Sequence, residues 1–334
     1  MGRPYHARGL GSALTVEDLM IPSDTAGITL HLRNKRSASM AGFSAERTIL
    51  LMHGATYSSE SLFDVPLGGF SFMDHLASSG YDVYAVDVRG YGGSTRPAEM
   101  DAPPGASVPL VRTGTGVRDL ASAVDFILRR RDLQSLNLVG MSWGGSVAGA
   151  YTARNNDKVL KLVLIAPLWL VDGPVPIDSG GSLGGYRKVS VMDSKARWLA
   201  AAPEAARASL VPEGWFELWA EASLATDPHG LTQSPRVMRA VNGPILDIRE
   251  YWAAGKPLYD PGKIRVPVLL THAEWDRDVP IESALRFFLS LTGAPYRRWV
   301  EIGEGTHMIL LEKNRLQAFD AIRQFLAELH RGGH

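Results

Sequence analysis

The stretch of residues 136–148 limits the possible folds of this chain more than any other feature. A short apolar run leads into Gly140-Met141-Ser142-Trp143-Gly144, and a run of small residues follows. This order predicts a buried strand, a sharp turn and the start of a helix. Side chains larger than glycine at 140 and 144 would collide where the strand and the helix cross. Ser142 is therefore predicted to lie at the bend, in a strained backbone conformation, with its hydroxyl exposed.

Strand and helix patterns alternate along most of the rest of the chain. Alternation of this kind predicts a parallel sheet with helices on both faces, hence an α/β fold. Residues 1–18 show no periodicity and are predicted to be unstructured. The predicted strands are 28–33, 48–53, 82–87, 136–139, 161–165, 266–271 and 296–301, and the predicted helices are 71–79, 117–128, 144–153, 282–291 and 314–329.

The alternation breaks near residue 168 and resumes near residue 263. The segment between these points has a loop rich in Gly and Pro at 172–186, followed by helical patterns at 193–210, 213–225, 234–241 and 245–254. It also holds five of the 8 tryptophans, which indicates a small apolar core and an apolar face over the sheet. We expect a core domain of residues 1–167 and 263–334 and a helical cap of residues 168–262. The side chains expected to line a substrate pocket are Thr56, Trp143, Trp169, Trp215 and Trp219.

Composition excludes several classes of function. Lys+Arg and Asp+Glu both total 35, and this balance gives no electrostatic reason to expect nucleic acid or an anionic membrane as a partner. The absence of cysteine excludes disulfides, thiolate metal sites and cysteine catalysis. No long apolar segment is present, so we expect neither a signal peptide nor a membrane span, and a cytoplasmic protein. No metal or cofactor is expected, and the oligomeric state stays open.

Three histidines follow the predicted carboxyl ends of strands, which face one crevice in a parallel sheet. A serine hydroxyl is a poor nucleophile and needs a base within hydrogen-bond reach. His307 lies in the loop 303–307 between the last strand and the last helix, where its imidazole can reach over Ser142, so it is the predicted base. His53 is expected to shape the loop after its strand, and His272 is expected to pack at a strand tip.

A base of this kind needs a carboxylate that fixes its tautomer and stabilises the imidazolium. Residues 271–280 offer three acids after a strand. Asp276 is the predicted partner of His307, Asp278 is the alternative, and Glu274 is the least favoured of the three.

The negative oxygen that forms during acyl transfer needs fixed hydrogen-bond donors. The N–H of Trp143 opens the predicted helix and points into the same space as the serine oxygen. The second donor is expected from the loop after His53-Gly54, at the N–H of Ala55, with the hydroxyl of Thr56 as a possible helper.

Taken together, these motifs resemble those of the α/β-hydrolase superfamily over nearly the whole chain. The resemblance is carried by His53-Gly54, by residues 87–94 (Asp-Val-Arg-Gly-Tyr-Gly-Gly-Ser), by the glycine-flanked serine, and by Asp276 and His307 in that order. It implies an eight-stranded, mostly parallel sheet with a helical cap inserted after the sixth strand. Serine at 142 differs from haloalkane dehalogenases and epoxide hydrolases, which carry aspartate there. The proline that often follows the His-Gly pair in the superfamily is absent.

The resemblance implies a serine hydrolase that cleaves carboxylic esters through an acyl-enzyme. Zero net charge and an aromatic cap favour a small-molecule or oligomeric ester that is apolar and uncharged. Residues 87–94 and the serine motif are also similar to those of proline iminopeptidases, which need cap carboxylates for the substrate ammonium. Acyl transfer, perhydrolysis and C–C bond hydrolysis use the same residues and stay open, whereas an intact set of catalytic groups disfavours a non-catalytic receptor. The cap acids available to an aminopeptidase are Glu204, Glu213, Glu217 and Glu221.

Overall fold

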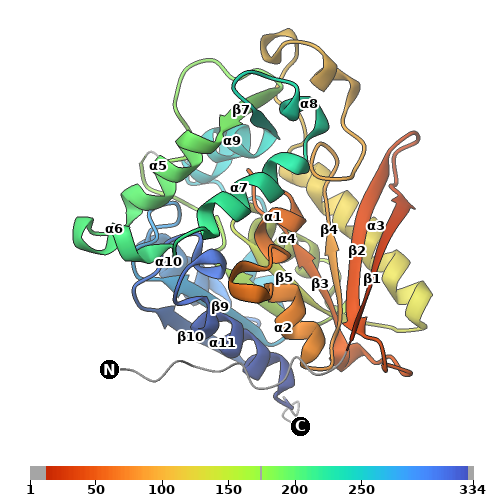
Figure 1. Cartoon of the computed structure of the whole chain (residues 1–334). Coiled ribbons are helices and arrows are strands. Elements are labelled where there is room, and N and C mark those ends of the chain that lie inside the picture. The colour runs from red at the N-terminus through yellow and green to blue at the C-terminus, as the bar shows by residue number, and fades with distance from the viewer. Residues whose placement is uncertain (1–12, 174, 330–334) are drawn as a thin grey trace.

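An eight-stranded sheet forms the centre of the computed structural model, which describes residues 13–173 and 175–329 (Figure 1). The strand order is β1-β2-β4-β3-β5-β6-β9-β10. β2 pairs antiparallel with β1 and β4, and all other neighbours are parallel, which confirms the predicted mostly parallel sheet. The strands are β1 Leu14–Pro22, β2 Thr29–Ser37, β3 Thr48–Met52, β4 Asp82–Val86, β5 Leu136–Met141, β6 Val159–Ile165, β9 Val268–Ala273 and β10 Arg297–Ile302.

Helices cover both faces of this sheet because the central strands are apolar on both sides. Leu50 and Met52 of β3 pack into one apolar cluster with α3, α4 and α10, whereas Ile49 and Leu51 pack into a second cluster with α2 and α11. Side chains alternate between the two faces of a strand, so one continuous apolar run supplies both cores. The helices of this part are α1 Ser59–Phe63, α2 Phe72–Ser78, α3 Thr113–Arg131, α4 Trp143–Thr152, α10 Ile281–Ser290 and α11 Arg315–Ala327.

The segment between β6 and β9 carries helices and a small second sheet, which gather in the upper part of Figure 1. The predicted helix at 234–241 is wrong, because Val237–Val241 forms strand β8 and pairs antiparallel with β7. The predicted helix at 193–210 is two helices, since Pro203 interrupts the backbone bonds between them. The division into core and cap domains stays a prediction. The elements are β7 Tyr186–Ser190, α5 Val191–Ala201, α6 Glu204–Leu210, α7 Trp215–Ala225, α8 Pro228–Leu231, β8, α9 Gly243–Asp247 and a π-helical turn Ile248–Trp252.

The prediction that residues 1–18 are unstructured is wrong for the part that the structure describes. β1 runs from Leu14 to Pro22 and pairs with β2 along its whole length. Val16 and Met20 are exposed on this edge strand, so its sequence lacks the apolar–polar alternation that would have indicated a strand. Residues 1–12, on which the expectation of no signal peptide depends, lie outside the described residues. Across 13–173 and 175–329, no helix is both long and apolar enough to span a membrane.

Candidate active site

Ser142 lies at a tight turn between β5 and α4, as the sequence predicts. Its backbone angles are φ 57° and ψ −122°, and its N–H donates to the carbonyl of Ile165 at 2.9 Å. A Cβ at Gly140 would lie 2.4 Å from the carbonyl oxygen of Gly144, and one at Gly144 would lie 2.3 Å from that of His53. Only glycine fits at both positions, so the two glycines allow the bend that exposes the serine.

The strain at Ser142 gives a testable effect on stability. A non-glycine residue at positive φ carries about 1–3 kcal/mol of strain that glycine does not. Ser142→Gly and Ser142→Ala both remove the hydroxyl, but only glycine relieves the backbone. We expect Ser142→Gly to be more stable than Ser142→Ala by about 1 kcal/mol, after the extra chain entropy of glycine in the unfolded state is subtracted. Urea denaturation of the two variants measures this difference, and equal midpoints would mean that the turn is not strained.

His307 pairs with Asp276, and Ser142 lines the same cavity as the imidazole. The Nδ1 of His307 lies 2.8 Å from Oδ2 of Asp276, and both side chains are buried. Oδ1 of Asp276 accepts the backbone N–H groups of Asp278 and Val279, each at 2.9 Å. Burial acts to lower the pKa of His307, but the negative charges of Asp276 and Asp278 outweigh it and raise that pKa above its usual value of 6.5. The carboxylate is thus fixed on one side by the backbone and holds the imidazole on the other.

The other acids of this loop have different partners. Asp278 forms an ion pair with Arg197 at 2.9 Å, and the exposed Glu274 accepts the N–H of Glu304 at 2.8 Å. Ligand atoms of Asp276, Asp278 and His307 lie within 4.8 Å of one another, close enough to hold a metal ion. The backbone, the imidazole and Arg197 already bond to these carboxylates.

The imidazoles of the other two histidines at strand ends form hydrogen bonds to the backbone. His53 is fully buried, and its Nε2 accepts the N–H of Val88 at 3.0 Å while its Nδ1 donates to the carbonyl of Gly54 at 2.7 Å. Burial lowers the pKa of His53, which favours this neutral form. The Nε2 of His272 lies 2.9 Å from the carbonyl oxygen of Val279. Neither imidazole lines the cavity that holds Ser142.

The loop after His53-Gly54 forms one wall of this cavity. Ala55 and Thr56 both line it. The carbonyl of Ala55 accepts the hydroxyl of Tyr91 at 2.7 Å and the Nη2 of Arg187 at 2.9 Å, which fixes the loop to the core and to β7. On the other side, Trp143 opens α4, and an N–H in the first turn of a helix has no intrahelical acceptor. The roles of Ala55 and Trp143 as oxyanion donors stay predictions.

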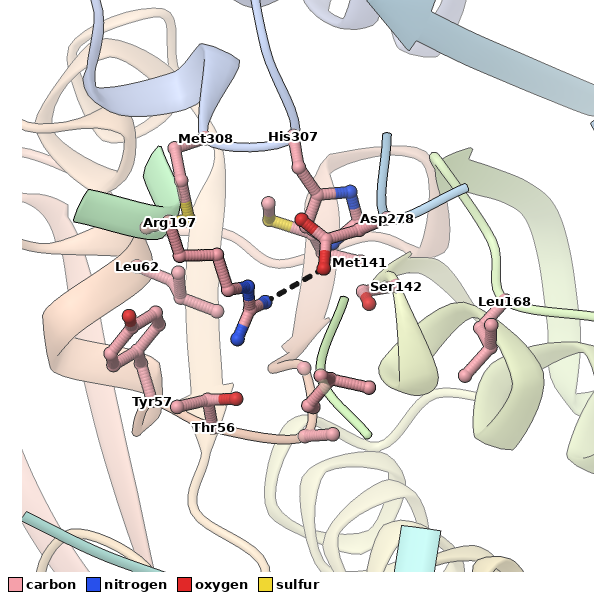
Figure 2. A pocket seen from close by; sticks show the side chains of 13 residues that line it. Thr56, Tyr57, Leu62, Met141, Ser142, Leu168, Arg197, Asp278, His307 and Met308 are labelled. Atoms are coloured by element: carbon pink, nitrogen blue, oxygen red, sulfur yellow. Dashed lines mark ion pairs between the residues drawn. The ribbon is translucent and has the colours of Figure 1, made fainter. Parts of the chain in front are cut away.

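The cavity itself is narrow and mostly apolar. Its free volume is about 30 Å³, space for no more than a few water molecules. Figure 2 shows Ser142 and His307 on one side and the guanidinium of Arg197 on the other, with a dashed line from Arg197 to Asp278. The remaining lining residues are Gly54, Ala55, Thr56, Tyr57, Leu62, Met141, Leu168, Ile177 and Met308.

None of the four tryptophans expected in the substrate pocket lines this cavity, and their roles in substrate binding stay predictions. The indole of Trp143 is fully buried in the core and donates to Thr113 at 2.9 Å, and Trp169 packs edge-on against Phe287. Trp219 lies behind the cavity wall, where its ring contacts Tyr57 edge-on at 5.0 Å. Trp215 packs against the guanidinium of Arg315 at 4.3 Å. Thr56 is the one residue of the predicted binding set whose side chain is part of the wall.

Sequence reasoning missed the two arginines near this cavity. Arg187 and Arg197 belong to β7 and α5, which frame the cap side of the site. Arg197 lies three residues after Ser194 and four before Ala201, which are both buried, so helical spacing alone could have placed it near the inward face of α5. Arg187 had no comparable signal, since β7 was not predicted as a strand.

The cap acids considered for an aminopeptidase point away from the cavity. All four are exposed, and none of them lines the space around Ser142. Glu221 pairs with Arg236 at 2.6 Å and Glu217 with Lys195 at 3.6 Å. The charged groups that face the site from the cap are therefore arginines, not carboxylates.

Comparison with known proteins agrees with this geometry. Residues 47–205 match the protein family described as alpha/beta hydrolase fold. The chain is similar to protein ABHD8 of Bos taurus, with 27% identity over 286 residues that cover 85% of this chain and 57% of ABHD8. The chain thus spans little more than half the length of the curated ABHD8 proteins of Bos taurus and Homo sapiens.

Solved structures show the same fold at low sequence identity. An esterase (EaEST) from Exiguobacterium antarcticum has a TM-score of 0.61 and 18% identity, covering 93% of this chain and 100% of that one. A serine hydrolase involved in carbazole degradation (CarC) has a TM-score of 0.61 and 17% identity, covering 94% and 99%. The eight-stranded sheet, the order of the motifs and the match to the family model show that this chain has the α/β-hydrolase fold.

Proposed function

We propose that this protein is a serine hydrolase that cleaves carboxylic esters through an acyl-enzyme. One observation carries the proposal: the strained Ser142 lines one small cavity together with His307, whose imidazole is held by Asp276. A nucleophile, a base and a carboxylate that orients the base are what acyl transfer needs. The similarity of the fold to that of the esterase EaEST is consistent with this function.

The proposed reaction has two halves. The Oγ of Ser142 attacks the ester carbonyl while Nε2 of His307 takes its proton, and the N–H groups of Ala55 and Trp143 stabilise the oxyanion. The C–O bond to the alcohol then breaks, and His307 returns the proton to the departing alcohol. Water attacks the acyl-enzyme in the same way, releasing the acid and restoring the serine. Asp276 keeps the proton of the resting imidazole on Nδ1, so that Nε2 is free to accept.

The charges of the cavity favour esters over aminoacyl substrates. A substrate ammonium would need a carboxylate free to receive it, whereas the cap presents guanidinium groups and exposed acids. Acyl transfer, perhydrolysis and C–C bond hydrolysis use the same three side chains, so they remain alternatives within the same site. No observation in the structure favours one of them over ester hydrolysis.

A substrate screen tests the proposed function. Purified protein is assayed against ethyl esters of graded acyl length and against proline naphthylamide, with the Ser142→Ala variant as the control for background. We expect ester turnover that disappears in the variant and no turnover of the amide. Amide turnover without ester turnover would instead support the aminopeptidase, and no turnover of either would refute the proposal.

The raised pKa of His307 predicts where activity is lost in acid. The imidazole accepts a proton only in its neutral form, and Asp276 and Asp278 hold its pKa above 6.5 despite burial. We expect kcat/KM for ethyl pentanoate, which does not titrate, to fall as the pH drops through a midpoint above 6.5. A profile recorded from pH 5 to 9 locates that midpoint. A midpoint clearly below the usual value for histidine would contradict this electrostatic description of the pair.

A further inference from the structure

Arg197 lies in the cavity with donors to spare. Its Nη2 contacts Oδ1 of Asp278 at 2.9 Å, and among the described residues Asp278 is its only ion-pair partner. Figure 2 shows the guanidinium between Asp278, Tyr57 and Thr56, on the side of the cavity opposite Ser142. A guanidinium has five N–H groups in a planar fork, and one contact to one carboxylate oxygen leaves most of them unused.

Arg187 adds a second positive charge on the same side. Its donors bond to neutral oxygens, at 2.9 Å for the carbonyls of Val241 and Ala55 and for the hydroxyl of Thr56. No carboxylate within the described parts of the chain pairs with it. Burial, together with the nearby charge of Arg197, lowers the pKa of Arg187 to about 10, so it stays charged at neutral pH. Arg197 thus lines the cavity, and Arg187 lies behind its wall at Ala55 and Thr56. Among the described residues, Asp278 is the one carboxylate that pairs with either guanidinium, because Asp276 is bonded to His307 and to the backbone.

An anionic ligand would accept the donors of Arg197 that Asp278 leaves unused. Thr56 adds a further donor, because its oxygen already accepts from Arg187 and its O–H remains to donate. The rest of the wall is apolar, with Leu62, Met141 and Leu168 among its members. The complementary ligand has a short apolar body and a negatively charged end.

We propose that Arg197 binds a free carboxylate of the substrate, so that the preferred substrates are half-esters of short dicarboxylic acids. The inference rests on the proposed ester hydrolysis and specifies its substrate class. A planar guanidinium fork matches a carboxylate in geometry and charge better than an ammonium does. The expectation of an uncharged substrate came from the zero net charge of the chain and from an aromatic cap, and neither carries information about the charge of one cavity.

Paired substrates test this specificity. The monoethyl esters of succinic, glutaric and adipic acid are compared with ethyl butanoate, pentanoate and hexanoate, which have the same number of carbons in the acid. The rate of ethanol release at varied ester concentration gives kcat/KM for each ester. We expect the wild-type protein to prefer at least one half-ester by about tenfold or more, the effect of one hydrogen bond between charged groups.

Variants of Arg197 test whether this residue causes the preference for half-esters. Arg197→Gln should lower the ratio of half-ester to neutral-ester kcat/KM by about tenfold or more, and Arg197→Lys should keep part of it. The matched control is Arg207→Gln, which removes an exposed arginine of α6 from the same cap outside this cavity and should keep the wild-type ratio. A wild-type preference for neutral esters, or an unchanged ratio in Arg197→Gln, would overturn the proposal.

A binding measurement separates this inference from the proposed function. Glutarate should raise the melting temperature of the Ser142→Ala protein and should not raise that of Ser142→Ala with Arg197→Gln. If no ester is cleaved but glutarate shows this difference, ester hydrolysis fails and the carboxylate site stands. If esters are cleaved without a charge preference and glutarate produces no shift, the carboxylate site fails and the esterase stands.

Discussion

Replacing Ser142 with alanine is expected to lower kcat for ester hydrolysis by about 10³- to 10⁶-fold, the range seen when a serine nucleophile is removed from such a site. No other hydroxyl among the side chains that line the cavity is placed at a strained strand–helix turn beside His307. The loss should be in kcat with little change in KM, because the hydroxyl acts in the reaction and contributes little to binding. Steady-state kinetics on ethyl esters measures both parameters.

The control for this variant is Ser209→Ala, which removes an exposed cap hydroxyl that donates to Ala206. It should retain wild-type kinetics. Circular dichroism and thermal melting of Ser142→Ala should show a folded protein, so that lost activity is not lost structure. Retention of more than about a tenth of the wild-type kcat would exclude Ser142 as the nucleophile.

Asp276→Asn is expected to lower kcat by about 10³- to 10⁴-fold without unfolding the protein. Its amide oxygen can keep the two backbone bonds that Oδ1 now accepts from Asp278 and Val279. The amide nitrogen would then face Nδ1 of His307 and donate to it. That moves the imidazole proton to Nε2, where the base can no longer accept the serine proton.

The matched variant Asp278→Asn separates the two candidate acids. Asp278 lies beside the pair and contacts Arg197 rather than the imidazole, so its loss should reduce kcat much less than Asp276→Asn does. Asp276→Asn should also move the acid midpoint of kcat/KM to lower pH, because the charge that raises the pKa of His307 is gone. A larger kcat loss in Asp278→Asn than in Asp276→Asn would assign the acid to Asp278.

Local patterns in the sequence predicted the sheet and the residues that approach one another at its edge. The strand ending at Met141, the helix after Ser142 and the position of His307 after β10 follow from periodicity and glycine spacing, because backbone sterics impose them. β1, β7 and β8 were missed, since β1 is an edge strand that exposes apolar residues, and β7 and β8 pair only with each other outside the main sheet. Their formation depends on pairing with distant partners, which one sequence does not reveal.

The cavity wall was the least predictable part of the site. Tryptophans were expected to line it, yet their large rings fill the cores behind it, where burial of apolar area is most favourable. No arginine was predicted to lie near the cavity. Arg187 and Arg197 instead face inward because carbonyls, a hydroxyl and Asp278 receive their donors there. Such partners come from three separate segments, and only the folded chain brings them together.

Covalent labelling of the nucleophile is the most direct test of the acyl-enzyme. The protein is incubated with a serine-directed fluorophosphonate and examined by intact mass, peptide mapping and residual esterase activity. We expect one label for each protein, attached to Ser142, with activity lost in proportion to labelling and no label on Ser142→Ala. A protein that hydrolyses esters at full rate while Ser142 stays unlabelled, or that is inactivated through a label elsewhere, would contradict the catalytic role of the residue at this turn.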